Sequence, residues 1–112
     1  MELTEITILF IFIMLDYLSG VLVAISEKQL NSSIGRKGIF TKFGIIICVI
    51  ICKLIDLLKI NGISPIAPIV TLFFIFNESF SILENLTKLN VPIPEVITST
   101  LKNFKNHKNG ID

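Results

Sequence analysis

The amino-acid sequence predicts an all-α integral membrane protein with three transmembrane helices and a short C-terminal amphipathic helix. Apolar residues make up 52% of the 112 residues, whereas charged residues make up only 17%. The apolar residues are gathered in three long blocks, Ile6–Ile25, Ile39–Leu58 and Ile63–Leu83. Each block is close to the ~20 residues with which a helix crosses a bilayer core. A chain of this length allows a single domain.

The basic residues predict how these spans are oriented. They fall in two regions: Lys28, Arg36, Lys37 and Lys42 between the first two blocks, and Lys88, Lys102, Lys105 and Lys108 after the third. The N-terminus instead carries Glu2 and Glu5, and the second connection offers only Lys59. Three spans place both basic regions on one side of the membrane, so the positive-inside rule predicts an outer N-terminus and a cytoplasmic C-terminus. Two or four spans are disfavoured because they would put both termini on the same side.

The first predicted span, residues 6–25, has an ionisable residue, Asp16, near its middle. Gly20 and Ala24 follow at four-residue steps on the same face, which allows close helix contact, and a carboxyl group beside them is not expected to face lipid. Two interpretations stay open: Asp16 is protonated and hydrogen-bonded inside the bundle with no further role, or it lines a pore or helix interface. A cleaved signal peptide is disfavoured, because the start is acidic and Asp16 interrupts the apolar region.

The second predicted span, residues 39–58, belongs to a helix that Ser32 or Ser33 could cap. The span contains Lys53 and Asp56 on one face. They can pair with each other, and Lys53 also lies near enough to the outer end to extend its ammonium group to the surface. Cys48 and Cys52 are interpreted as small apolar residues that pack inside the helix. Three cations are expected at the headgroup level, where anionic lipid attracts them: Arg36, Lys37 and Lys42. Membrane anchoring is favoured over nucleic-acid binding for this patch.

The third predicted span, residues 65–86, begins with Ser64 as N-cap and Pro65 in the first helical position. Asn90 is expected to cap its other end before Pro92. Polar residues gather largely on one side of this helix: Asn77, Glu78, Ser81, Glu84 and Asn85. The helix is longer than the ~30 Å core, so Glu84, Asn85 and Lys88 are expected to be interfacial, whereas Asn77, Glu78 and Ser81 are costly groups inside the membrane. Glu78 is the position most expected to carry function.

The last predicted element is a short helix over residues 95–105. Apolar residues recur at roughly helical spacing, with basic residues between them: Val96, Ile97, Leu101 and Phe104, with Lys102 and Lys105. This pattern is typical of an interfacial helix, here on the inner leaflet.

The sequence contains no glycine-rich phosphate loop, no zinc-ligand set and no nucleophile elbow. The candidates for acid–base chemistry are Asp16, Glu78 and Tyr17, all inside predicted spans. We therefore expect no enzyme activity, no cofactor, no metal site and no nucleic-acid partner.

Three segments carry a resemblance to a known family. DYLSG (16–20), SSIGRKGIFTK (32–42) and NESFSILENLTKLNVPIPE (77–95) resemble the phage-lysis and toxin-secretion holin family of Gram-positive bacteria and their phages, which includes the clostridial toxin-secretion holin. The third segment is the most specific. Asn90 departs from the glycine of many relatives, and the short chain fits a plain prophage holin better than a dedicated secretion protein. Met14 lies inside the first span and gives no support to a dual-start inhibitor.

The resemblance implies a single holin domain over residues 1–112 that forms homo-oligomers in the bacterial cytoplasmic membrane. It implies lesions that release an endolysin, or a toxin in some relatives, without required direct contact, and so cause host cell lysis. The residues expected on a pore or oligomer face are Asp16, Tyr17, Gly20, Lys53, Asp56, Asn77, Glu78 and Ser81. Two alternatives stay open: an antiholin or accessory membrane subunit, and a small cation-coupled transporter that uses Asp16 or Glu78 as its carrier carboxylate.

Overall fold

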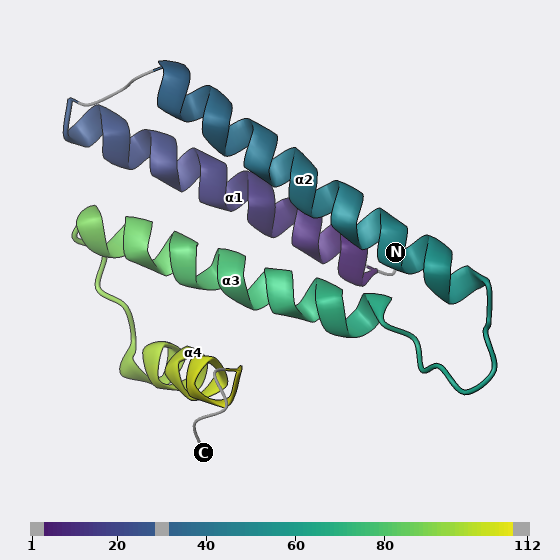
Figure 1. Cartoon of the computed structure of the whole chain (residues 1–112). Helices are drawn as coiled ribbons and strands as arrows, with labels where there is room; N and C mark the ends of the chain where they lie inside the picture. The colour runs from purple at the N-terminus through teal and green to yellow at the C-terminus, as the bar shows by residue number, and fades with distance from the viewer. Residues whose placement is uncertain (1–3, 29–31, 109–112) are drawn as a thin grey trace.

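The computed structural model describes residues 4–28 and 32–108, with side chains for residues 4–28 and 38–103. Its four helices are α1 (Glu5–Ser26), α2 (Ser32–Leu57), α3 (Ala67–Lys88) and α4 (Glu95–Lys108). Figure 1 shows α1, α2 and α3 as three long neighbouring helices, with the shorter α4 beside α3. The described residues form no strand. α1, α3 and the Gly38–Leu57 part of α2 are long and apolar enough to cross a membrane. The predicted fold class is therefore confirmed.

The second helix extends beyond its predicted span. α2 begins at Ser32, where Ser32 or Ser33 was expected to cap it, and its membrane-length part, Gly38–Leu57, agrees with the predicted span of residues 39–58. The apolar block shows where the chain can enter hydrocarbon, but polar residues continue the same helix beyond that block. α1 begins one residue before the predicted span and ends one residue after it. Its first turn is capped by Thr4, whose hydroxyl oxygen accepts the backbone N–H of Thr7 at 3.2 Å.

The start of α3 shows a correction with a clear physical reason. Ser64 was expected to cap this helix, but the capping group is the carboxylate of Asp56 on α2. Its two oxygens accept the backbone N–H groups of Ile66 at 2.8 Å and Ala67 at 2.7 Å. A carboxylate satisfies these otherwise unpaired donors and lies at the positive end of the helix dipole. α3 consequently begins at Ala67 rather than Pro65 and is tied to the C-terminal end of α2.

The apolar packing is concentrated between α1 and α3, with a narrow strip of α2 added. Leu9 and Ile13 of α1 form a buried cluster with Val49 of α2, and Val70 and Phe74 of α3 pack against it. Many large apolar side chains of α1 and of the described part of α2 are instead exposed; examples on α2 are Phe40, Phe43, Ile47 and Leu54. Such a surface suits a helix surrounded by lipid.

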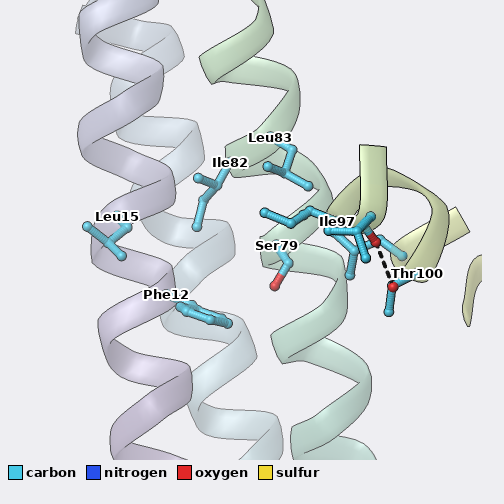
Figure 2. A pocket seen from close by; sticks show the side chains of 9 residues that line it. Phe12, Leu15, Ser79, Ile82, Leu83, Ile97 and Thr100 are labelled. Carbon is cyan, nitrogen blue, oxygen red and sulfur yellow. Dashed lines mark hydrogen bonds between the residues drawn. The ribbon is translucent and has the colours of Figure 1, made fainter. Parts of the chain in front are cut away.

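α3 ends in a turn at Asn90, which adopts a left-handed φ of 65°. Asparagine is among the residues that adopt this conformation most readily at a helix end, in agreement with its predicted capping role. The chain then turns into α4, which packs beside α1 and α3 and leaves an apolar groove of about 470 Å³. Figure 2 shows Phe12 and Leu15 of α1 and Ile97 of α4 at this groove. The location of α4 on the inner leaflet stays a prediction.

Candidate functional site

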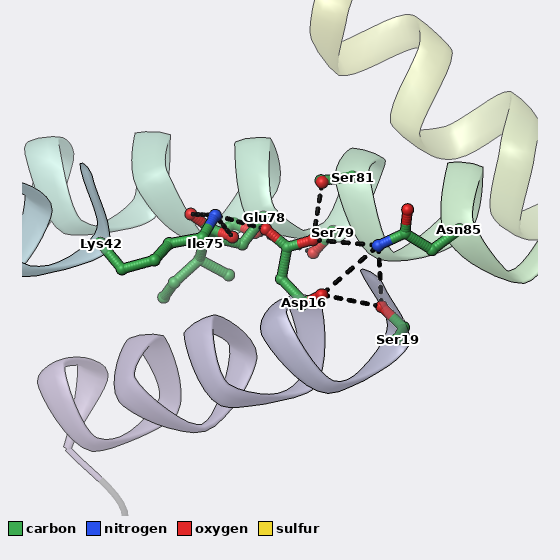
Figure 3. Close-up of polar contacts among 8 residues, drawn as sticks. All are labelled: Asp16, Ser19, Lys42, Ile75, Glu78, Ser79, Ser81 and Asn85. Carbon is green, nitrogen blue, oxygen red and sulfur yellow. Dashed lines mark hydrogen bonds and ion pairs between the residues drawn. The ribbon is translucent and has the colours of Figure 1, made fainter. Parts of the chain in front are cut away.

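Three charged side chains from three different helices meet inside the bundle. Lys42 of α2 donates hydrogen bonds from its Nζ to Oδ2 of Asp16 on α1 at 2.5 Å, and to Oε1 and Oε2 of Glu78 on α3 at 3.0 and 2.9 Å. The side chains of Asp16 and Glu78 are 5% and 4% exposed, and that of Lys42 is 23% exposed. We call these three residues the charge cluster; Figure 3 shows them between the helices.

Further polar groups join Asp16 to α3 independently of Lys42. Ser81 donates from Oγ to Oδ1 of Asp16 at 2.6 Å. The amide of Asn85 donates to the same Oδ1 at 3.3 Å and to Oγ of Ser19 at 2.9 Å (Figure 3). Ser19 in turn donates to the backbone carbonyl of Asp16 at 3.0 Å. In the described part of the chain, no buried side-chain nitrogen or oxygen lacks a hydrogen-bond partner.

Residue spacing explains why these groups share one interface. Glu78, Ser81 and Asn85 follow at steps of three and four residues, so they lie on one face of α3. Gly20 contributes by its small size, because a Cβ atom placed there would lie 3.7 Å from the amide nitrogen of Asn85. Because Gly20 has no side chain, α1 leaves room for the amide group of Asn85 on α3.

The depth of the charge cluster follows from the helix boundaries. Its members Asp16, Lys42 and Glu78 each lie ten residues from the same end of the bundle, where α1 ends, α2 begins and α3 ends (Figure 1). Ten helical residues correspond to about 15 Å, half of a ~30 Å hydrocarbon core. All three charges are therefore level with one another, near the middle of the spanning region.

The electrostatics of the cluster couple the three helices. Charges in an apolar medium are costly unless they are paired and hydrogen-bonded. Two carboxylates share one ammonium group, so the cluster carries a formal charge of −1 when both acids are ionised. Removal of α2 would leave two buried carboxylates without a cation, and removal of α1 or α3 would cost Lys42 one of its two acidic partners. This arrangement can hold a particular packing of the three helices.

The structure brings together four of the predicted site residues, Asp16, Gly20, Glu78 and Ser81. It separates others from this centre. Tyr17 and Lys53 are exposed, and Asp56, the predicted partner of Lys53, is bound to the backbone of α3. Asn77 is half-buried, whereas Glu84 and Lys88 are exposed; the interfacial role of the latter two stays a prediction.

Two residues expected at the interface lie at the central site instead. Lys42 was expected at the headgroup level. Because α2 begins at Ser32, Lys42 lies ten residues into the helix and is level with Asp16 and Glu78. Asn85 was expected beyond the membrane core, yet its amide binds Asp16 and Ser19. The other predicted interfacial cations are Arg36 and Lys37, whose side chains lie outside the described part of the structure.

Sequence reasoning missed Ser19 altogether and missed Lys42 as the partner of the acids. A usable signal was present for Lys42. The expected cap at Ser32 or Ser33 already places Lys42 about ten residues into the second helix. That depth matches the distances of Asp16 and Glu78 from the ends of α1 and α3. No comparable signal singles out Ser19, since a serine within a span usually bonds to its own helix backbone.

Comparison with known proteins gives a consistent family assignment. The model of the bacteriophage holin family matches residues 3–106. An uncharacterized protein of Clostridium perfringens strain 13 is 41% identical over 101 residues, which cover 90% of this chain and 75% of the relative. A probable holin of Bacillus phage phi105 is 34% identical over 101 residues, covering 89% and 73%. The uncharacterized protein YqxH of Bacillus subtilis is 35% identical over 102 residues, covering 90% and 71%. No solved structure matches this chain.

Proposed function

Because the chain belongs to the bacteriophage holin family, we propose that it oligomerises in the bacterial cytoplasmic membrane and opens lesions there. The lesions let an endolysin reach the cell wall, which leads to lysis of the host cell. In a cell that produces a toxin instead of an endolysin, the same lesions would release the toxin. The holin family is not an enzyme family, and the proposed activity includes no catalytic step.

The observation that carries this proposal is the charge cluster in the middle of the spanning region. A protein that only anchors itself in a membrane does not need buried ionic groups, which are costly there. In the closed molecule, Asp16, Lys42 and Glu78 satisfy one another. If the helices separate, the same groups become available to line water. The two arrangements are alternative states of one set of side chains, and opening is a shift between them.

The outer surface supports the lipid-facing part of this proposal. Large apolar side chains are exposed on all three spanning helices, for example Leu18, Phe40 and Ile69. A soluble monomer would rarely expose so much contiguous apolar surface. Accumulation in a bilayer before opening is therefore compatible with the closed structure, whose polar groups face inward.

The deciding experiment is induced expression in a bacterium with and without a co-expressed cytoplasmic endolysin. We expect an abrupt loss of membrane potential in both cases, with lysis only when the hydrolase is present. Continued growth at high membrane levels of the protein would contradict the proposal and favour an antiholin. Substrate-dependent proton flux without lysis would favour a small transporter.

A pair of variants tests the role of the charge cluster within this function. The double variant Asp16→Asn/Glu78→Gln removes both acidic charges with little change in shape, and we expect it to shift the time of lysis. Tyr17→Phe is the matched control, because Tyr17 follows Asp16 directly but is exposed. Equal lysis times for the parent and both variants, at equal membrane levels, would show that the polar faces have no role.

A further inference from the structure

α2 is attached to the rest of the bundle by specific polar bonds at two separate points. Near its C-terminal end, Asp56 binds the backbone N–H groups at the start of α3. Farther along, Lys42 binds Asp16 and Glu78. We call the contact of Asp56 with α3 the hinge, because the short connection of residues 58–66 begins there.

The remaining attachment of α2 is apolar and narrow. Val49 and Cys52 are its buried residues in the described part of the helix, and Gly44 has no neighbouring atom within 4 Å of an added Cβ. In a bilayer, apolar contacts between helices are exchanged for similar contacts with lipid chains, so they give little specific attachment. The bonds of Lys42 therefore give this end of α2 a specific attachment to α1 and α3.

α1 and α3 have polar contacts of their own that do not involve α2. Ser81 and Asn85 of α3 bind the side chain of Asp16, and Asn85 also binds Ser19. If α2 moves away, these bonds can keep α1 and α3 together. The acidic pair of Asp16 and Glu78 then remains on their common face as a preformed binding site for an ammonium group.

A modest tilt of α2 is sufficient to release Lys42. Lys42 lies fourteen residues from Asp56, which corresponds to about 21 Å along the helix. Rotation about the hinge by roughly 30° moves the Lys42 end by about 10 Å, the usual distance between neighbouring helix axes. Tilts of this size are within the range of transmembrane helices. The ammonium group would then need a new acidic partner inside the membrane.

We propose that α2 pivots about the Asp56 hinge and that its Lys42 transfers to Asp16 and Glu78 of a second copy of this chain. The contact that closes one subunit thereby becomes the contact that joins two subunits. Each copy offers one α2 and one acidic pair, so the contact is head-to-tail and can continue into a ring or an open array. This inference rests on the proposed holin function and names the helix face through which the subunits join.

Disulfide crosslinking tests the movement of α2 without disturbing the charge cluster. In a parent with Cys48→Ala and Cys52→Ala, Ile13→Cys and Ile45→Cys are introduced together. Ile45 packs against the buried cluster that contains Ile13, and the two residues are level because Ile13 lies three residues before Asp16 and Ile45 three residues after Lys42. Oxidation of the closed protein should form an intrachain disulfide and abolish lysis in cells with endolysin, and a reductant should restore lysis. Failure of the pair to crosslink, or undelayed lysis by the fully crosslinked protein, would overturn the proposal.

Transfer to a second copy is tested by placing the two cysteines on different chains. Chains carrying Ile13→Cys and chains carrying Ile45→Cys, with tags of different size, are co-expressed in the same parent. Ile45 is used because it lies eleven residues from Asp56 and therefore moves with the Lys42 end of α2. We expect a disulfide-linked heterodimer that appears at the onset of lysis and is absent from earlier samples. The control pair is Ile13→Cys with Phe40→Cys, because Phe40 is 71% exposed and points away from the bundle; this pair should not crosslink.

The outcomes separate this inference from the proposed function. If the cysteine-free parent fails to lyse cells that contain endolysin, the holin function itself is contradicted. If the parent lyses them but the mixed chains never form the heterodimer, the transfer of α2 to a second copy is wrong. Equal crosslinking of the control pair would also overturn it, because α2 would then have no preferred face.

Discussion

The ammonium group of Lys42 bridges carboxylates on two other helices, so its removal affects more than one contact. In Lys42→Met, two acids remain buried beside each other without a cation. Breaking a buried ion pair in this way costs about 3–5 kcal/mol in soluble proteins. We therefore expect a clearly lower thermal unfolding temperature in detergent and less accumulation in the membrane.

A neutral triple variant serves as the control for this prediction. Asp16→Asn/Lys42→Met/Glu78→Gln removes the isolated charges that the single change creates, and replacement of a complete ionic group is often close to neutral for stability. We expect most of the lost unfolding temperature to return. A triple variant as unstable as Lys42→Met would show that the shape of the side chains, rather than charge pairing, dominates.

The two acids of the cluster are not equivalent. Asp16 accepts bonds from α2 through one oxygen and from α3 through the other, whereas both oxygens of Glu78 accept from Lys42. Asp16→Asn and Glu78→Gln remove the same charge, and each leaves a single side-chain oxygen. The oxygen of the glutamine can keep a bond to Lys42, whereas the oxygen of the asparagine cannot accept from both Lys42 and Ser81, which donate to different oxygens of Asp16. We expect Asp16→Asn to lower the unfolding temperature and change lysis time more than Glu78→Gln. Equal effects of the two variants would contradict this ranking.

At the level of single residues, the sequence predicted which polar side chains are energetically costly inside a membrane. It did not predict which side chains pair with them. Asp16, Glu78 and Ser81 could be identified because polar residues at helical spacing stand out within apolar blocks. Lys42 was not assigned to them because its position was judged from the start of the apolar block rather than from the start of the helix. The role of Asn85 was missed for a related reason, because it was assigned to the interface and its bonds to Asp16 and Ser19 depend on how α1 and α3 pack.

Among the helices, the prediction was best where a span coincides with its apolar block, as in α1. It was weaker at the start of α3, where sequence signals next to the helix favoured Ser64. The capping group comes from Asp56 on another helix, and a contact of this kind depends on how α2 and α3 pack. Local capping rules therefore located the beginning of α3 approximately but named the wrong residue.

The hinge at the start of α3 gives a prediction at the level of helix pairs. Asp56→Ala removes two charge-assisted hydrogen bonds to backbone donors and should cost about 1–2 kcal/mol, as loss of a helix cap does. Lys53→Met is the control, because Lys53 lies on the same helix and is exposed. Circular dichroism in detergent should show a lower unfolding temperature for Asp56→Ala and little change for Lys53→Met.

Proteolysis measures the same contact locally. Residues 58–66 connect α2 to α3, and they should be cleaved faster in Asp56→Ala than in the parent, because α3 has lost the group that fixes its first turn. Asp56→Asn keeps one acceptor oxygen and should give an intermediate rate. Identical cleavage of the alanine variant and the Lys53→Met control would mean that Asp56 does not hold the connection.

For the molecule as a whole, the basic side chains are divided unequally between its two ends. The end where α1 and α3 stop carries the exposed Lys28 and Lys88, together with Glu27 and Glu84, whereas the opposite end carries Glu5 and Lys59 (Figure 1). Lys42 no longer counts toward the first end, because it belongs to the charge cluster. The excess of lysine and arginine at that end nevertheless remains when Lys42 is left out, since Arg36 and Lys37 lie in the first turns of α2.

This bias predicts that the end carrying Lys28 and Lys88 lies in the cytoplasm, with α4, while the hinge lies at the outer surface. Alkaline phosphatase inserted after Asn61 should be active outside the cell, and a fluorescent protein fused to the C-terminus should fluoresce inside. Glu2→Lys together with Glu5→Lys makes the outer end basic and should weaken this preference, which gives a control that leaves the spans unchanged. Phosphatase activity from a C-terminal fusion would reverse the orientation. It would also place the hinge on the cytoplasmic side, so that the freely pivoting end of α2 would be the outer one.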